Sequence, residues 1–421
     1  MKNEYLPRIV DLKINESMEV MGAILIEGCK WCGKSTTAIH HAKTIVEFQN
    51  PDKKEEYDNI RDTKPSLFLK GEKPLLFDEW QMYPVVWDSI RTDVDHTRLK
   101  GQYILTGSSK PKEGETMHTG TGRFARILMR PMSLYESKES TGEVSFEDIL
   151  KGKDIEGVSK LTLEDIASII VRGGWPASLD IKSDAKYKIA KQYVSSLIHE
   201  EVKNVDGVER NPEKMKSVLR ALARNISTPA SDKTLEDDVK NVFNEEISRP
   251  TLTNYINTLE KLFVIENIKA TNLNFRSKYA IRTKAKKEFV DPSIATAILE
   301  ISPSDLIKDL NTFGFLFEAL CIRDLLIYTQ SYGGDITFYR DETNFEIDAI
   351  FRTSSGKWGA IEIKLGAGYI DEAAKNLLKF KEKVDTNKVG EPAFLMVLTG
   401  STYSYRRKDG VYVVSIGTLK N

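Results

Sequence analysis

The 421-residue sequence has few cysteines and no strong net charge of either sign. Three cysteines are too few for a disulfide framework, and a net charge of -1 gives no global bias toward nucleic acids or acidic partners. No apolar run approaches the roughly 18 residues of a membrane helix, and the first residues lack the apolar core of a signal peptide. These absences predict a cytoplasmic protein with no membrane partner, and the length predicts two to four domains.

One octet, Gly-Cys-Lys-Trp-Cys-Gly-Lys-Ser at 28–35, matches the phosphate-binding loop pattern at every fixed position. Glycines at both ends let the backbone amides turn inward toward phosphate oxygens. Lys34 is expected to reach the β- and γ-phosphates, and the Ser35 hydroxyl to bind Mg²⁺. The apolar run 22–28 predicts a preceding strand, and 35–46 predicts a following helix. The expected nucleotide-binding residues are Gly28, Cys29, Lys30, Trp31, Cys32, Gly33, Lys34, Ser35 and Thr36.

Two of the three cysteines, Cys29 and Cys32, lie inside this loop with C-x-x-C spacing. No second Cys or His pair stands at the distance of a zinc site, so the spacing does not predict a metal. Redox control of the loop and coincidental spacing are the two alternatives, of which coincidence is favoured.

A carboxylate pair follows a second apolar stretch, Pro-Leu-Leu-Phe, at Asp78 and Glu79. Nucleotide sites of open α/β sheets lie at the carboxyl ends of the strands, which is where this pair is expected. Asp78 is predicted to hold Mg²⁺, and Glu79 to polarise the attacking water. The pair favours a hydrolase over a small-molecule kinase. A third strand at 103–109 contains Thr106 and Ser108, which are candidates for contact with the γ-phosphate or its water.

Two arginines, Arg123 and Arg126, follow that third strand after a glycine-rich stretch. A fixed guanidinium there could act as an arginine finger on the nucleotide of a neighbouring subunit in a homo-oligomer. A structural role on the surface is an equal alternative for each of them. Arg123 is taken as the candidate catalytic arginine.

The sequence resembles a prokaryotic family of AAA+ predicted ATPases with a C-terminal domain of unknown function. The resemblance rests on the octet, Phe-Asp-Glu-Trp-Gln at 77–81, Thr-Gly-Ser-Ser at 106–109, Arg-Pro-Met-Ser-Leu-Tyr-Glu-Ser at 130–137 and Arg-Gly-Gly-Trp-Pro at 172–176. It runs nearly end to end and implies ATP as the nucleotide, an ASCE-type ATPase core, a winged helix and a restriction-endonuclease-like C-terminus. Cys and Trp occupy loop positions where many relatives have small residues or proline.

The expected fold is α/β, with four regions. An AAA+ P-loop core at 1–140 precedes a helical lid or linker at 141–208, whose first helix begins with the capping-box pattern Thr162 and Asp165. A winged-helix domain is expected at 209–290 and a PD-(D/E)XK nuclease-like domain at 291–421.

The winged-helix prediction rests on an amphipathic helix that begins near Ser248. Its outer face offers polar side chains that could read bases or bind phosphate, namely Arg249, Thr251, Thr253, Asn254 and Asn257. The stretch 272–287 is rich in Lys and Arg with interleaved aromatics, as in a wing that contacts DNA. DNA is the favoured partner; a protein-binding role is the alternative.

A second group of chemical residues lies in the last region. Glu318 stands in an apolar helix, where an unpartnered carboxylate would be costly. Asp348 shares a strand face with Glu346, and Glu362 shares one with Lys364. The order of Glu318, Asp348, Glu362 and Lys364 is similar to that of PD-(D/E)XK nucleases, in which two carboxylates bind Mg²⁺ and a lysine helps the attacking water. Glu318, Asp348 and Glu362 are therefore the expected metal ligands, and Lys364 the expected catalytic lysine.

Two hypotheses follow from these patterns. In the first, the chain hydrolyses ATP, holds DNA and cuts it with the C-terminal region and Mg²⁺. In the second, ATP switches a DNA- or protein-binding module and no strand is cut.

Overall fold

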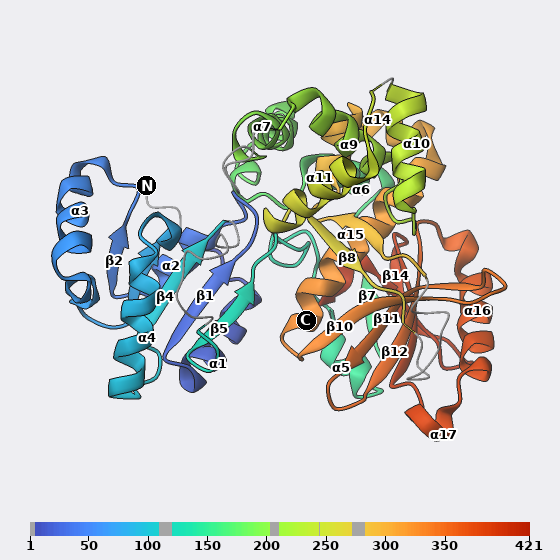
Figure 1. Ribbon diagram of the computed structural model, residues 1–421. Coiled ribbons are helices and arrows are strands. Elements are labelled where there is room, and N and C mark those ends of the chain that lie inside the picture. The colour runs from blue at the N-terminus through green and yellow to red at the C-terminus, as the bar shows by residue number, and fades with distance from the viewer. Residues whose placement is uncertain (1–4, 109–119, 203–209, 244, 272–282) are drawn as a thin grey trace. The chain divides into compact units, whose positions relative to one another are not determined.

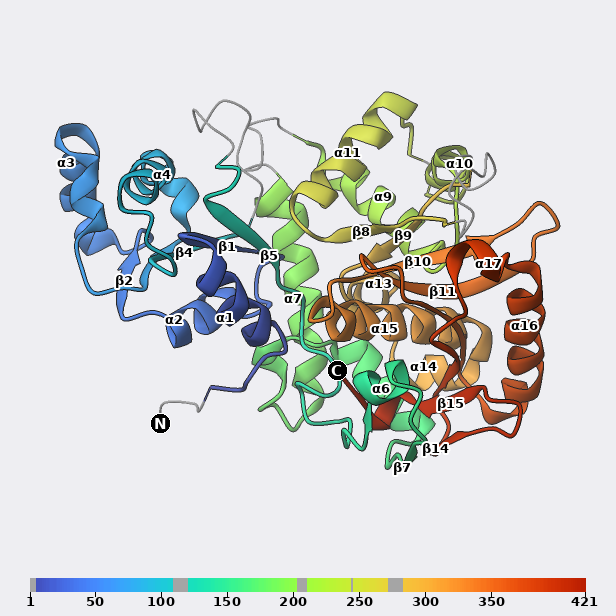
Figure 2. The same ribbon diagram turned by 90° about the horizontal axis from the view of Figure 1, so that it is seen from below.

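The computed structural model describes residues 5–108, 120–202, 210–243, 245–271 and 283–421, and it divides into two compact units (Figures 1 and 2). One unit contains the chain up to Arg130, and the other contains most of the chain from Pro131 to Asn421. Within the described residues, no helix has the length and apolar character needed to cross a membrane.

The first unit is built on a five-stranded parallel sheet with strand order β2-β3-β4-β1-β5. Its strands are β1 (Ala23–Glu27), β2 (Thr44–Glu47), β3 (Leu75–Asp78), β4 (Tyr103–Gly107) and β5 (Phe124–Leu128). Its helices are α1 (Val10–Val20), α2 (Lys34–His41), α3 (Lys54–Thr63) and α4 (Val85–Thr97). The central strands β1 and β4 are buried along their whole length, as expected of parallel strands covered on both faces.

Helices cover both faces of this sheet, with α1 and α2 on one face and α4 on the other (Figure 2). On the α4 face, Trp87, Ile90 and Val94 pack against Leu25, Phe77 and Leu105 of the strands. This core fixes the carboxyl ends of β1, β3 and β4 beside one another. The polar side chains that follow those strands are therefore gathered at one edge of the sheet.

The helix after the phosphate loop is shorter than the predicted 35–46. It ends at His41, and residues Thr44–Glu47 form the edge strand β2, which pairs in parallel with β3. The β-branched side chains of Thr44, Ile45 and Val46 favour a strand once a partner strand is present. The absence of Gly or Pro from this stretch had indicated one continuous helix, and that prediction was wrong.

The second unit contains a mixed seven-stranded sheet with strand order β10-β11-β12-β13-β15-β14-β7. Its strands are β7 (Glu156–Val158), β10 (Gly334–Arg340), β11 (Glu346–Thr353), β12 (Trp358–Lys364), β13 (Phe394–Thr399), β14 (Tyr403–Arg406) and β15 (Tyr412–Ser415). Two small sheets join β6 (Val144–Ser145) to β16 (Leu419–Lys420) and β8 (Ile265–Ile268) to β9 (Lys286–Phe289). The helix α15 (Leu310–Gln330) packs on β10, β11 and β12, and α16 (Ile370–Lys383) packs on β11, β12 and β13.

The other helices of this unit include the capping-box helix predicted from Thr162 and Asp165, and the structure confirms both halves of that box. The α-helices of this unit other than α15 and α16 are α5 (Phe146–Leu150), α6 (Leu163–Arg172), α7 (Lys188–Ser196), α9 (Pro212–Arg224), α10 (Asp232–Phe243), α11 (Arg249–Lys261), α13 (Ser293–Leu299), α14 (Pro303–Lys308) and α17 (Thr386–Val389).

The segment 141–208, expected to be helical, also supplies strands to the C-terminal region. Strand β7 extends the large sheet by pairing with β14, and β6 pairs with β16 at the end of the chain. The side chains of β7 alternate weakly and the strand is three residues long, so its sequence carries little strand signal. The contacts thus gather residues 141–202 and the C-terminal region into one unit.

The motifs at 130–137 and 172–176 meet at a buried ion cluster in this unit. The Arg323 guanidinium of α15 lies 2.8 Å from an Asp291 oxygen and 2.7 Å from an Asp324 oxygen. Asp324 also accepts the backbone N–H of Leu134, and Asp291 accepts that of Gly174. These charges are fully buried but satisfied, so both motifs have a structural role here.

Candidate functional site

The phosphate loop leaves β1 at Glu27 and enters α2 at Lys34. Gly28 has φ +152°, and a Cβ there would lie 2.1 Å from the carbonyl oxygen of Met129, so only glycine fits without a shift of the backbone. Gly33 is the N-cap of α2, with φ +101°. Both fixed glycines of the pattern thus occupy conformations that other residues rarely adopt. The N-terminus of α2 points its backbone N–H groups at the loop, which suits an anion.

The loop is held by two cations bonded to its backbone carbonyls. Lys34 Nζ donates to the carbonyl oxygen of Cys29 at 2.8 Å, and Arg8 Nη1 donates to that of Cys32 at 2.9 Å. Both loop thiols are fully buried. A hydrogen bond from Cys29, together with the charges of Lys34 and Arg8, lowers the pKa of Cys32 to about 6 against the effect of burial. Sequence reasoning missed Arg8, which lies outside every recognised motif.

Asp78 at the end of β3 joins the loop to the neighbouring strand. Its Oδ1 accepts the Ser35 hydroxyl at 2.8 Å and the Thr106 hydroxyl at 2.5 Å. The Thr106 hydroxyl also accepts the backbone N–H of Glu79 at 3.1 Å. The structure therefore brings together the predicted residues of three separate motifs.

Glu79 follows in a left-handed conformation, with φ +53°. Its Oε2 accepts the Ser108 hydroxyl at 3.2 Å and the side-chain amide of Gln81. Among the residues described by the structure, neither Asp78 nor Glu79 forms an ion pair. Gln81 had no predicted role, although it lies within a motif quoted for the family resemblance. The turn after β3 places the Gln81 side-chain amide against the Glu79 carboxylate, which no local sequence pattern predicts.

The two candidate arginines lie elsewhere in this unit. Arg123 precedes β5 and donates to Asp95 of α4 at 2.7 Å, at the opposite end of the strands from the phosphate loop. Arg126 donates to Glu27 at 2.7 Å, and its guanidinium lies 5.6 Å from the centre of the Trp87 ring. Neither arginine reaches Asp78 or Glu79 in the same chain. The role predicted for Arg123, which acts on a neighbouring subunit, stays a prediction.

The geometry defines a class of protein. A parallel sheet carries a phosphate loop after β1 and a carboxylate pair after β3, with β4 and its Thr106 between them. Such a sheet is a P-loop nucleotide-binding fold, in which Lys34 and the loop amides fit phosphates. Ser35 and Asp78 offer a hydroxyl and a carboxylate with no internal cation, which suits Mg²⁺.

Comparison with protein families makes the class more specific. Residues 21–138, most of which belong to the first unit, match the family described as AAA domain. Residues 163–305 match a domain of unknown function (DUF8612), and residues 313–419 match another (DUF4143). No curated protein matches the chain.

Three solved structures resemble the chain at low identity. A Walker-type ATPase of Pyrococcus abyssi is 16% identical, with TM-score 0.44, over 71% of this chain and 97% of that one. The replication initiator DnaA bound to AMPPCP and single-stranded DNA is 14% identical, with TM-score 0.29, over 60% and 86%. A signal transduction ATPase with numerous domains and a tetratricopeptide repeat sensor, from Pyrococcus horikoshii, is 12% identical, with TM-score 0.25, over 78% and 50%.

The second unit brings the predicted nuclease-like residues into one cluster. Lys364 Nζ lies 3.1 Å from Asp348 Oδ2 and 2.8 Å from Glu362 Oε2. Asp348 Oδ2 also accepts the backbone N–H of Ile363 at 2.7 Å. The helix α15 brings Glu318 close enough for the Asp348 charge to affect its pKa. Order and spacing in the sequence therefore predicted this gathering of side chains.

Asp348 lies at an irregularity in its strand. Thr337 of β10 pairs with Ile350, but Tyr339 pairs with Ile347, so β11 has one extra residue at this point. A β-bulge of this kind redirects side chains and breaks the alternation of the strand. Glu346 nevertheless pairs with Lys286 at 2.7 Å, and the charge of Asp348 also raises the pKa of that lysine. Both carboxylates thus lie toward the same ammonium group, as the prediction of a shared face requires.

Lys286 of β9 joins this cluster, and sequence reasoning missed it. Its Nζ lies 2.8 Å from Glu318 Oε1 and 2.7 Å from Glu346 Oε1, and its side chain is 3% exposed. Lys286 was predicted to be part of a DNA-contacting wing, and the structure contradicts that placement. Most of the predicted wing, 272–282, lies outside the described residues.

The electrostatics of the cluster are dominated by burial. Burial raises the pKa of Glu318 to about 8 and that of Glu362 to about 8, although lysines lie beside both. The surrounding carboxylates raise the pKa of Lys286 and of Lys364 despite their burial. Burial therefore disfavours the ionised form of both glutamates, and the ammonium groups 2.8 Å away favour it.

The cluster does not fit the Mg²⁺ that the nuclease-like resemblance implies. Among the described residues, no three His, Cys, Asp or Glu side chains converge as a metal site. One oxygen of each predicted ligand is instead paired with the ammonium group of Lys286 or Lys364. The predicted metal ligands are thus gathered, but already paired.

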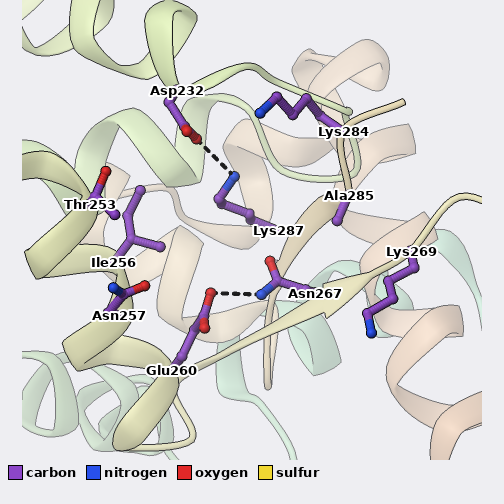
Figure 3. A pocket seen from close by; sticks show the side chains of 10 residues that line it. All are labelled: Asp232, Thr253, Ile256, Asn257, Glu260, Asn267, Lys269, Lys284, Ala285 and Lys287. Atoms are coloured by element: carbon purple, nitrogen blue, oxygen red, sulfur yellow. Dashed lines mark hydrogen bonds and ion pairs between the residues drawn. The ribbon is translucent and has the colours of Figure 1, made fainter. Parts of the chain in front are cut away.

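A groove lies between α11 and the β8–β9 hairpin of the same unit (Figure 3). Its cavity is about 330 Å³ and is lined by Asp232, Thr253, Ile256, Asn257, Glu260, Asn267, Lys269, Lys284, Ala285 and Lys287. Lys287 pairs with Asp232 at 3.4 Å, and Asn267 donates to Glu260 at 2.6 Å. The exposed Lys269 and Lys284 form no ion pair with any residue that the structure describes.

The outer face of α11 supplies one wall of this groove, as its amphipathic pattern predicts. Leu252, Tyr255 and Leu259 are buried, whereas Thr253 and Asn257 are exposed. Two other residues predicted on this face are engaged within the unit, because Asn254 accepts from Arg210 and Arg249 pairs with Glu236.

Proposed function

We propose that the chain binds and hydrolyses ATP with its first unit and binds DNA with the groove of its second unit. The observation that supports hydrolysis most directly is the arrangement at the end of β3. Asp78 is bonded to Ser35 and Thr106, and Glu79 is bonded to Ser108 and Gln81. The AAA-domain match supports the same assignment.

The residues of this site have separate roles in the transfer of the phosphoryl group to water. The loop amides and Lys34 bind the phosphates, and Ser35 and Asp78 would hold Mg²⁺, which when bound neutralises phosphate charge. Glu79 orients the attacking water and accepts its proton. Gln81 and Ser108 act as positioning residues for the Glu79 carboxylate. Thr106 fixes the backbone at Glu79 through its hydroxyl.

Steady-state phosphate release and equilibrium binding of a fluorescent ATP analogue test this proposal together. Glu79→Gln should abolish turnover and keep nucleotide binding, whereas Lys34→Ala should lose both. Absence of nucleotide binding in the wild-type chain would refute the proposal. Loss of binding in Glu79→Gln would refute the role given to Glu79.

DNA binding is supported by the groove beside α11. The exposed ammonium groups of Lys269 and Lys284 can contact phosphates, while Thr253 and Asn257 on the facing helix can donate and accept hydrogen bonds at base edges. Fluorescence anisotropy with labelled duplex and single-stranded DNA tests this. Lys269→Ala/Lys284→Ala should weaken binding, and unchanged affinity would favour a protein partner for the groove.

Strand cleavage is not part of this proposal. The nuclease-like residues Glu318, Asp348 and Glu362 are gathered, but each is paired with the ammonium group of Lys286 or Lys364, which competes with Mg²⁺ for the same carboxyl groups. Incubation of plasmid DNA with Mg²⁺ or Mn²⁺ distinguishes the two hypotheses from the sequence. We expect no nicking, and nicking that disappears in Asp348→Ala would restore the nuclease hypothesis.

A further inference from the structure

The buried lysine of the acidic cluster, Lys286, is placed where cation chemistry is expected. Its ammonium bridges Glu318 of α15 and Glu346 of β11, at 2.8 and 2.7 Å. It also lies 5.1 Å from the centre of the Phe338 ring, whose face favours a cation. Three different elements thus converge on one ammonium group.

The neighbouring lysine of the strand has a different environment. Lys287 is directed away from the cluster, lines the groove and pairs with Asp232 (Figure 3). Successive residues of a strand point to opposite sides, which explains how one of two adjacent lysines lies in the cluster and the other lines the groove. Lys287 therefore provides a matched comparison on the same strand.

A divalent cation at this cluster would have to share its carboxyl groups with Lys286 and Lys364, each of which already lies within 3.1 Å of two of them. Mg²⁺ binds carboxylate oxygens at about 2.1 Å, closer than any ammonium group that donates to the same oxygen. If Mg²⁺ displaced the Lys286 ammonium group, that group would be buried without its carboxyl partners. An unpaired buried charge is strongly unfavourable. Competition between the internal cation and a dissolved one therefore favours the internal cation.

We propose that the Lys286 ammonium takes the place of the divalent cation in this nuclease-like cluster. The cluster binds no divalent metal, and its cation is a side chain of the hairpin strand β9. Lys286 thereby anchors that strand to α15 and β11. The proposal does not depend on ATP hydrolysis or on DNA binding.

Binding of Mn²⁺ to the full chain without nucleotide, measured by electron paramagnetic resonance, tests this directly. We expect the wild type and Asp348→Asn to bind the same amount of Mn²⁺, because the cluster of the wild type holds none. Lys286→Met should create one Mn²⁺ site with affinity raised at least about tenfold, because a positive charge leaves the cluster. Lys287→Met should behave as the wild type.

Each outcome decides the proposal. Wild-type Mn²⁺ binding that disappears in Asp348→Asn would overturn it, and this comparison needs no change at Lys286. A folded Lys286→Met chain without a new Mn²⁺ site would also overturn it. If Lys286→Met does not fold, Lys286→Gln, which keeps a hydrogen-bond donor, replaces it with the same expected gain. A gain that survives addition of Asp348→Asn would place the metal elsewhere and count against the proposal.

Discussion

The chain contains two groups of carboxyl residues for which the sequence predicts metal chemistry, and their hydrogen-bond and charge partners differ. At the end of β3, Asp78 and Glu79 are held by hydroxyls and an amide, which are neutral donors. In the cluster around Asp348, ammonium groups lie within 3.1 Å of the carboxylates. The first arrangement leaves negative charge for an external cation, and the second satisfies it internally.

This difference shows why similar residue types do not define a similar chemistry. A carboxylate bonded to neutral donors keeps its charge and stays a ligand for Mg²⁺. A buried carboxylate beside an ammonium group has its charge compensated, and adding a divalent cation would leave an excess of positive charge. The electrostatic partner of each carboxylate therefore decides between a catalytic and a structural role.

The strongest test of the phosphate-loop site removes its proposed base. Glu79→Gln should lower kcat for ATP hydrolysis by about a hundredfold or more, because the amide cannot accept a proton from water. Binding of ATP should change little, since the phosphate contacts remain. Glu55→Gln, the same chemical change at an exposed position of α3, serves as control. Turnover near the wild-type rate in Glu79→Gln would show that another group activates the water.

Replacement of lysine by methionine at Lys286 and at Lys34 compares the structural role of one lysine with the nucleotide-binding role of the other. Lys286→Met should destabilise the second unit by about 3–5 kcal/mol, because buried carboxylates lose their cation. Lys34→Met should cost about 1 kcal/mol of stability, since Lys34 donates one hydrogen bond to a loop carbonyl, but it should abolish ATP binding. Denaturant unfolding and nucleotide titration measure the two effects. A small stability loss in Lys286→Met would contradict the anchoring role.

A smaller effect is expected from the positioning residue Gln81. Gln81→Ala should lower kcat about tenfold with KM nearly unchanged, because the Glu79 carboxylate loses one of its two side-chain partners. Gln81→Glu should be worse than alanine, since like charges would repel Glu79. Gln102→Ala, at the other end of β4, is the matched control. An equal rise in KM would instead place Gln81 in substrate binding.

The acidic cluster should also give the second unit a distinctive pH dependence. Folded-state pKa values of about 8 for Glu318 and Glu362 exceed their ordinary value of 4.5, so the folded state binds more protons between these limits. Stability is fully present below pH 4.5 and falls as the pH rises toward 8, by up to about 1.4 kcal/mol per pH unit for each group.

Thermal unfolding of the second unit between pH 5 and 8 measures that slope. Glu362→Gln should flatten it, because the amide mimics the protonated carboxyl without titrating. Glu342→Gln, at an exposed position, should leave the slope unchanged. A stability that rises over this range would show that the lysines keep both glutamates ionised.

Much of the first unit was predictable from the sequence, because its signals are local. The loop octet, the strand before it and the carboxylates after β3 each follow from a few adjacent residues. The role of Lys286 was not predictable, since a lysine among lysines indicates an exposed surface and its burial depends on Glu318 and Glu346 far along the chain. The strand β7 was missed for a related reason: its partner, β14, is distant in sequence.

The smallest expected effect is a change in the salt dependence of DNA affinity, which should differ among the lysines of the groove. If DNA lies between α11 and the hairpin, Lys269→Ala and Lys284→Ala should each reduce the slope of log affinity against log salt concentration by about 1, because each contacts one phosphate. Lys287→Ala should reduce it less, since Asp232 already compensates part of that charge. Anisotropy titrations from low to high salt measure these slopes. Equal slopes in the wild type and all three variants would show that DNA does not contact the groove. If Lys287→Ala lowers the slope most, DNA displaces Asp232 from Lys287.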